Sequence, residues 1–193
     1  MATEFELKYR CTPELLAQIQ AAYPGSWTRT PMSTTYFDTP DAELSRRHWT
    51  LRHRKEGEKD ICTLKTPAPG NARGEWELEC ADITRAVPHL AAACGIGDLE
   101  TLAAKGLIAA CGARFTRLSR ILELQGCTAE LALDEGILLG GGKEIPLCEA
   151  ELELKSGDPA DLVDFASLFQ SKFNLSVESK SKFARAKALA QEE

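Results

Sequence analysis

The chain has 193 residues, of which 44% are hydrophobic and 27% charged, and its formal net charge at pH 7 is −6. This composition is that of an ordinary globular protein and excludes a disordered or membrane-spanning chain. The negative charge opposes a general attraction to nucleic acid, because that attraction depends largely on Lys and Arg neutralising phosphates. We therefore expect one domain over residues 1–193 that binds neither nucleic acid nor membrane.

Short segments with the two-residue periodicity of strands recur along the chain. They cover residues 4–9, 34–38, 50–55, 61–66, 75–80, 116–124, 129–134 and 148–155. Helical patterns separate them at residues 13–22, 84–94, 98–105, 158–172 and 180–190. The pattern predicts an α+β protein with a mainly antiparallel sheet, and about eight strands suit a closed β-barrel.

The cysteines and the N-terminus indicate a cellular compartment. Seven cysteines are scattered without a C-x-x-C pair, which fits reduced thiols better than a disulfide framework or a zinc site. The N-terminal residues lack the basic and apolar regions of an export signal. We expect a cytoplasmic protein.

Charged residues alternate with apolar ones in five of the predicted strands, so that each of these strands has one charged face. These faces carry Glu4, Glu6 and Lys8; Arg52 and Arg54; Lys65; Glu75, Glu77 and Glu79; and Glu149, Glu151 and Glu153. A single strand of this kind usually turns its charged face to water. Several of the faces carry charges of one sign, however, and such charges repel one another on a solvated sheet.

A sheet that closes with its charged faces inward would explain these like charges. Carboxylates would hold hard divalent cations such as Mg²⁺ or Mn²⁺, while Arg and Lys would hold the anion that those cations bridge. An eight-stranded barrel is wide enough for one small ligand, and buried charges are tolerated when they are paired or metal-bound. A polyphosphate would complete the charge balance.

The segment Glu4-Phe5-Glu6-Leu7-Lys8 resembles the E-x-E-x-K signature of the CYTH, or triphosphate tunnel metalloenzyme, superfamily. Further motifs follow in order: Tyr36-Phe37-Asp38-Thr39, Leu51-Arg52-His53-Arg54, Leu64-Lys65, Arg73-Gly74-Glu75-Trp76-Glu77, Thr116-Arg117, Glu130, Leu133-Asp134-Glu135-Gly136, Glu149 to Leu154, and Ser181-Lys182-Phe183-Ala184-Arg185. The resemblance is closest to the bacterial inorganic triphosphatases, without the helical phosphate-binding domain that some of them append. It implies an eight-stranded antiparallel tunnel with flanking helices and a C-terminal helix.

The resemblance also implies a role for each charged residue. The metal ligands would be Glu4, Glu6, Glu151 and Glu153. The substrate-binding cations would be Lys8, Arg52, Arg54, Lys65, Arg117, Lys182 and Arg185. Glu75, Glu77 and Glu130 would orient a second metal ion or the attacking water. The cofactor would be Mg²⁺ or Mn²⁺, and the reaction would be hydrolysis of tripolyphosphate to pyrophosphate and phosphate.

Several alternatives stay open at this point. The tunnel motifs read a triphosphate and leave its organic substituent unspecified, so thiamine triphosphatase, nucleoside triphosphatase and adenylate cyclase activities are compatible with them. A non-catalytic sensor of polyphosphate or nucleotide is an alternative of a different class. The sequence also leaves open the role of Arg120, the group that accepts the proton of the attacking water, and whether Asp134 and Glu149 are solvated at the tunnel mouth.

Overall fold

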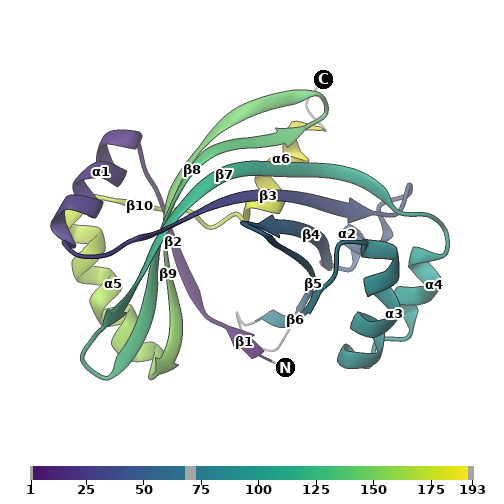
Figure 1. The fold of residues 1–193 in the computed structure, drawn as a ribbon, viewed down its shortest axis with the longest axis horizontal. Coiled ribbons are helices and arrows are strands. Elements are labelled where there is room, and N and C mark those ends of the chain that lie inside the picture. Colours follow the sequence, from purple (N-terminus) through teal and green to yellow (C-terminus); the bar gives the residue numbers. More distant parts are fainter. Residues whose placement is uncertain (1, 68–72, 191–193) are drawn as a thin grey trace.

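The computed structural model describes residues 2–67 and 73–190 and contains a curved antiparallel sheet with helices packed on it (Figure 1). The strands are β1 (Ala2–Glu4), β2 (Glu6–Arg10), β3 (Thr28–Asp38), β4 (Thr50–Glu56), β5 (Lys59–Pro67), β6 (Arg73–Glu79), β7 (Ile108–Glu123), β8 (Cys127–Gly140), β9 (Lys143–Gly157) and β10 (Ser176–Val177). The helices are α1 (Pro13–Ala22), α2 (Glu43–Arg46), α3 (Ile83–Cys94), α4 (Asp98–Ala103), α5 (Pro159–Phe173) and α6 (Lys182–Leu189). The predicted α+β class is confirmed.

The N-terminal strands connect the two ends of the sheet. The strand order is β1-β6-β5-β4-β3-β7-β8-β9-β2-β10, so β1 and β2 lie far apart in the order although only Phe5 separates them in the chain. The backbone N–H of Leu154 donates to the carbonyl oxygen of Phe5 at 2.9 Å. The hydrogen-bonded ladder itself is not closed, but the chain passing through Phe5 gives the sheet the barrel-like form that the sequence predicts.

Two features of the fold differ from the sequence prediction, one in the sheet and one in the helices. Within the described residues the sheet has ten strands where about eight were expected, because Phe5 interrupts the first strand and because β10 has only two residues, too few for a pattern. Helix α2 was not predicted, since its four residues are too short for a helical repeat. The buried carboxylate of Asp38 holds α2 in place by accepting hydrogen bonds from the backbone N–H groups of Leu44 and Ser45 at 3.0 and 3.3 Å.

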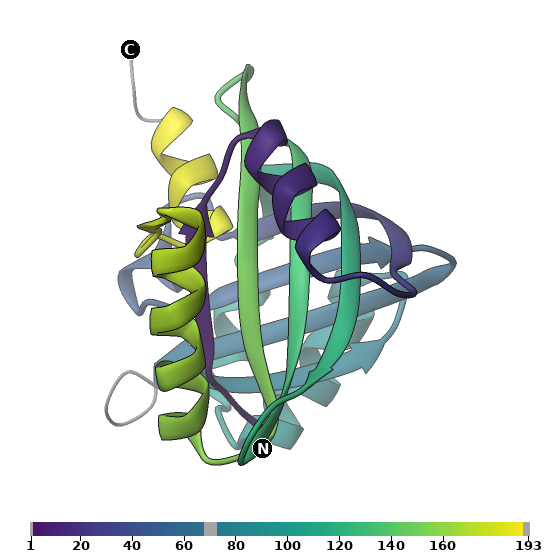
Figure 2. The same ribbon diagram turned by 90° about the vertical axis from the view of Figure 1, so that its left-hand side faces the viewer.

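Apolar side chains cover the outer face of the sheet and leave its inner face to polar groups. Helices α1 and α5 pack against β9 around Tyr9, Leu152 and Phe169, on the side that Figure 2 turns toward the viewer. Helices α3 and α4 cover the other end of the sheet around Leu51 and Leu64. Leu51 and Leu64 are fully buried, and they alternate with the charged residues of β4 and β5, so those charges face inward.

Helix α6 belongs to neither of these two groups of helices. It packs with Phe115 and Leu138 and lies beside β7 and β8 (Figure 1). Its N-cap is Ser181, whose hydroxyl oxygen accepts a hydrogen bond from the N–H of Ala184 at 3.1 Å. This cap starts the helix two residues later than the expected position 180. Within the described part of the chain, none of the helices has the length and apolar character needed to span a bilayer.

Gly140 allows α6 to approach β8 closely. A Cβ atom at this position would overlap the backbone carbonyl oxygen of Ala186 in α6. We therefore expect Gly140→Ala to displace α6 and to lower the free energy of unfolding by about 1–3 kcal/mol, the usual cost of overpacking. Urea denaturation measures this change. Gly97→Ala is the control, because an added Cβ there meets no atom within 4 Å; equal stability of the two variants would contradict the prediction.

Candidate functional site

The sheet encloses a polar cavity of about 810 Å³. Most of the charged residues proposed from the sequence line it: Glu6, Lys8, Arg52, Arg54, Lys65, Glu75, Glu77, Arg117, Glu130, Glu151, Glu153 and Lys182. Glu4 lies in β1, but its side chain is outside the described part of the structure. Arg185 is not among the residues that line the cavity. The strands that carry these charges therefore converge on a common space, as the like-charged faces indicated.

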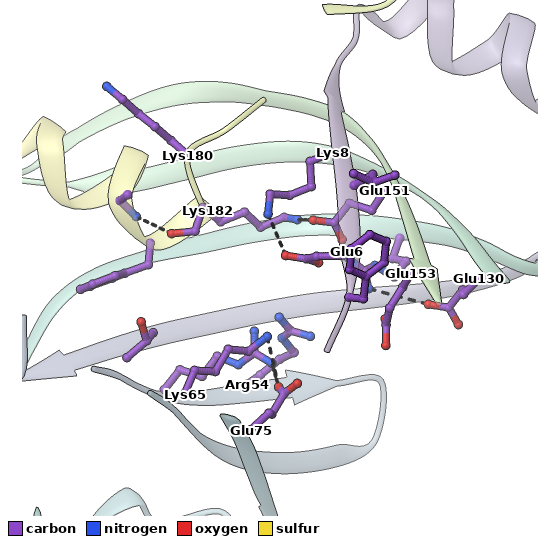
Figure 3. A pocket seen from close by; sticks show the side chains of 18 of the residues that line it. Glu6, Lys8, Arg54, Lys65, Glu75, Glu130, Glu151, Glu153, Lys180 and Lys182 are labelled. Atoms are coloured by element: carbon purple, nitrogen blue, oxygen red, sulfur yellow. Dashed lines mark hydrogen bonds and ion pairs between the residues drawn. The ribbon is translucent and has the colours of Figure 1, made fainter. Parts of the chain in front are cut away.

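One wall of the cavity is acidic. Glu6 of β2 is paired in register with Glu153 of β9, and Glu153 is in turn paired with Glu130 of β8. Figure 3 shows these three carboxylates gathered on one side of the pocket. The ammonium of Lys8 lies 2.7 Å from Glu6, and that of Lys155 lies 2.8 Å from Glu153. Such a row of like charges is unfavourable by itself and favours a cation between its members.

The facing wall is basic and is formed by β4, β5 and β6. Arg54 and Lys65 lie across the pocket from the acidic row (Figure 3). Glu75 and Glu77 are counter-ions on this wall: Glu75 lies 3.2 Å from Lys65 and 3.4 Å from Arg52, and Glu77 lies 3.7 Å from Arg52. Burial, followed by the positive charges of Arg52 and Arg117, lowers the pKa of Arg54 to about 10. Arg54 therefore remains charged at neutral pH, and it lines the cavity together with Arg52 and Lys65.

A buried ionic cluster lies where α6 meets β8 and β9. Asp134 and Glu149 are 0% exposed, and Glu151 is almost as buried. The ammonium of Lys182 lies 2.8 Å from Asp134 and 2.9 Å from Glu151, and it also contacts Glu149. Arg117 donates to both carboxylate oxygens of Asp134, at 2.8 and 2.7 Å, and contacts Glu151. Asp134 and Glu149 are thus buried partners of cations and not solvated groups.

These contacts set the charge states within the cluster. Burial raises the pKa of Glu149, despite the opposing effect of Lys182. Burial also acts to raise the pKa of Glu151, but the charges of Lys182 and Arg117 together hold it well below the ordinary value. Burial would lower the pKa of Lys182, whereas Asp134, Glu151 and Glu149 raise it. Lys182 is therefore a fully charged ammonium at neutral pH.

The carboxylates of the cluster are also spaced for metal binding. One ligand oxygen from each of Asp134, Glu149 and Glu151 lies within 4.8 Å of the others. Three cationic side chains, Lys182, Arg117 and Arg185, already neutralise this trio. A metal ion there would have to displace Lys182, whereas the row of Glu6, Glu153 and Glu130 opens directly onto the cavity.

The structure places Arg185 and Arg120 outside the lining of the cavity. Arg185 points to the outer side of the ionic cluster, where it contacts Glu149 and lies 3.7 Å from Glu178. Arg120 lies away from the cavity, where its guanidinium donates to the carbonyl oxygens of Tyr23 and Pro24, both at 2.7 Å. Arg120 thus anchors the loop between α1 and β3.

Sequence reasoning missed some residues that line the cavity. Glu56 and Lys155 are among them, and both were within reach of the strand alternation. Glu56 continues the parity of Arg52 and Arg54 one residue past the predicted end of that strand, and Lys155 continues the parity of Glu151 and Glu153. Ser179 and Lys180 also line the cavity. No strand or helix periodicity could mark Ser179 and Lys180, because their segment is neither strand nor helix.

The sequence and the fold are those of a known family. The model of the CYTH domain matches residues 2–186, and the chain belongs to the CYTH family. A curated relative, the inorganic triphosphatase of Haemophilus influenzae, is 30% identical over 194 residues that cover 96% of this chain and 54% of the relative. The chain thus spans about half the length of this relative.

Solved structures share the fold over almost their full length. HpAC1 from Hippeastrum, named as an adenylyl cyclase candidate with a dominant triphosphatase activity, has a TM-score of 0.68 and 17% identity, with 97% of this chain and 96% of HpAC1 covered. The PH1819 protein of Pyrococcus horikoshii has a TM-score of 0.64 and 18% identity, with 98% and 99% covered. At these identities the likeness shows the fold alone.

Proposed function

We infer that the protein is a metal-dependent triphosphatase that cleaves inorganic triphosphate to pyrophosphate and phosphate. The observation that carries this proposal is that one cavity is lined both by a row of carboxylates and, across from it, by a cluster of Arg and Lys side chains. A site for an anion alone would need only the basic wall. The name of the Haemophilus influenzae relative supports the same reaction.

The basic wall is suited to the oxyanions of a polyphosphate. Arg52, Arg54 and Lys65 provide cationic donors from neighbouring strands, and Arg forms geometrically specific bonds to phosphate. Lys8 and Lys182 add positive charge from β2 and α6. The first turn of α6 also lines the cavity, and a helix N-terminus favours negative charge. These groups would hold the substrate and stabilise negative charge as a phosphoryl group is transferred.

The acidic row provides ligands of the right chemistry for a hard divalent cation. Glu6 and Glu153 offer carboxylate oxygens at the cavity surface, and Glu151 lies beside them on β9. Glu4 joins this proposed set through its alternation with Glu6 in the sequence. Mg²⁺ or Mn²⁺ bound here would polarise phosphate oxygens. Because Glu151 is shared with the Lys182 cluster, the acidic row and α6 are electrostatically linked.

The remaining carboxylates divide into two roles. Glu75 contacts both Arg52 and Lys65, so it positions these cations. Glu77 accepts a hydrogen bond from the hydroxyl of Thr63 at 3.1 Å and opens onto the cavity. Glu130 opens onto the cavity from the opposite wall. We assign to Glu77 and Glu130 the role of orienting the attacking water. The water would then attack the terminal phosphoryl group in line with the leaving pyrophosphate, without a covalent enzyme intermediate.

A substrate panel tests the proposed reaction. Tripolyphosphate, ATP and thiamine triphosphate are each incubated with the protein and Mg²⁺ or Mn²⁺, with EDTA as the control, and the products are identified by ³¹P NMR. We expect pyrophosphate and phosphate from tripolyphosphate, with the highest kcat/KM of the three and no turnover in EDTA. Release of a cyclic nucleotide from ATP, or tight binding without turnover, would contradict the proposal in favour of a cyclase or a sensor.

Glu6→Gln tests the metal assignment. The substitution keeps the shape of the side chain but removes one anionic ligand, so we expect Mn²⁺ affinity to fall by about tenfold or more, with turnover falling at subsaturating metal. Isothermal titration calorimetry with Mn²⁺ measures the affinity directly, without reliance on activity. Glu100→Gln is the matched control, because Glu100 is exposed on α4. Unchanged Mn²⁺ affinity in Glu6→Gln would remove Glu6 from the metal site.

A further inference from the structure

The segment between α5 and α6 forms a strap along one edge of the cavity. We call residues 175–181 the C-terminal strap. Its β10 residues pair with β2, with Ser176 opposite Arg10 and Val177 opposite Tyr9. The N–H of Glu178 then donates to the carbonyl oxygen of Lys8 at 2.8 Å. Directly after this contact the strap turns over the cavity, where Ser179, Lys180 and Ser181 line it and lead into Lys182.

Glu178 is the buried anchor of this strap. Its residue is 4% exposed, and its carboxylate accepts hydrogen bonds from Nε of Arg10 at 2.8 Å and from the N–H of Lys180 at 2.9 Å. Burial would raise the pKa of Glu178, but the hydrogen bonds from Arg10 and Lys180 and the charge of Arg185 lower it. The carboxylate is therefore ionised at neutral pH and ties the strap to β2.

Glu178 also reaches the ionic cluster through Arg185. One terminal nitrogen of Arg185 lies 3.7 Å from Glu178, and the other contacts Glu149. Glu149 in turn contacts the ammonium of Lys182, which lines the cavity. Glu178, Arg185, Glu149 and Lys182 thus form a series of groups with alternating charge. Each side chain restricts the position of the next one. In Figure 3, Lys182 reaches toward Glu151, whereas Lys180, two residues before it, points away from Glu151.

We propose that Glu178 is a positioning residue for substrate binding: it fixes the C-terminal strap on β2 and, through Arg185 and Glu149, holds Lys182 at the cavity. This inference rests on the proposed function for its link to substrate. The strap contacts themselves do not depend on which triphosphate is cleaved. Because Glu178 does not touch the cavity, its loss should affect the binding of substrate more than the chemical step.

Two substitutions test this role without removing any group that lines the cavity. Glu178→Gln keeps an acceptor for the N–H of Lys180 but removes the charge that faces Arg10 and Arg185. Arg10→Gln breaks the same pair from its outer side, and the Arg10 side chain is 62% exposed, so folding is preserved even if Glu178→Gln is unstable. Glu100→Gln on α4 is the matched control.

We expect hydrogen exchange in residues 178–184 to become faster by about tenfold in Glu178→Gln and by a smaller factor in Arg10→Gln, because hydrogen bonds to charged groups are lost. KM for tripolyphosphate should rise by about five- to tenfold in Glu178→Gln, with kcat within about twofold of the wild type. Exchange that matches the wild type in both variants would overturn the positioning role. A wild-type protein that cleaves no triphosphate would instead overturn the proposed function, and the exchange experiment would still decide whether Glu178 anchors the strap.

Discussion

Lys182→Met is expected to lower the free energy of unfolding by about 3–5 kcal/mol, the usual cost of leaving buried charges without a partner. Lys182 neutralises Asp134, Glu149 and Glu151, and the first two of these are 0% exposed. Methionine fills a similar volume without the charge. Denaturant unfolding measures the loss, and Lys180→Met is the control because Lys180 is an exposed neighbour that points away from the cluster.

The same variant should change the dependence of stability on pH. Lys182 lowers the pKa of both Glu149 and Glu151, so its removal raises the pKa of these groups in the folded state. Groups with a raised pKa bind protons more readily when folded, and their protonation stabilises the fold as pH falls. The difference in stability between Lys182→Met and the wild type should therefore shrink from about pH 8 to about pH 5. A loss below about 1 kcal/mol, or a difference that does not depend on pH, would contradict the account of the cluster.

Arg52→Ala is expected to lower kcat/KM for tripolyphosphate by about 10²- to 10³-fold, as for the loss of one preorganised donor to a developing charge. Arg52 is buried in the basic wall, and its Nε atom has no hydrogen-bond partner within the described part of the chain. The fold should tolerate the change, because Glu75 keeps its contact with Lys65. Steady-state phosphate release with saturating Mg²⁺ measures the effect.

Arg114→Ala is the matched control for Arg52→Ala. Arg114 lies on β7 in an exposed ion pair with Glu144, at 3.0 Å, and it does not line the cavity. Its removal should change kcat/KM by less than about twofold, since exposed ion pairs contribute little. If Arg52→Ala retained wild-type kcat/KM, or if both variants lost activity equally, the basic wall could not be the substrate site.

The sequence predicted the part of the site that depends on strand alternation. Glu6, Arg52 and Glu153 could each be assigned to one face, because side chains on a strand alternate and each of the three has a leucine next to it in the chain. Once the outer face is covered by helices around Leu51 and Leu152, the charged faces have to line the interior. The strand periodicity was therefore sufficient to predict that the charged residues of the two walls face a common interior.

The remaining parts of the site depend on contacts that periodicity does not encode. Arg185 shares a helix with Lys182, yet its side chain contacts Glu178 and Glu149. This direction follows from how α6 packs beside β8. Glu178 lies in an irregular segment, so no repeat marks it as buried. Asp134 and Glu149 could be placed on the correct face, but their burial follows from the insertion of the Lys182 side chain between them.

The most direct test of the central claim is a crystal structure of the protein with Mn²⁺ and an imido-bridged triphosphate analogue that resists hydrolysis, with Mn²⁺ located by its anomalous scattering. We expect the analogue to lie in the cavity against Arg52, Arg54 and Lys65, with Mn²⁺ between the analogue and the carboxylates of Glu6 and Glu153. An analogue bound on the outer surface, or Mn²⁺ bound away from the acidic row, would contradict it.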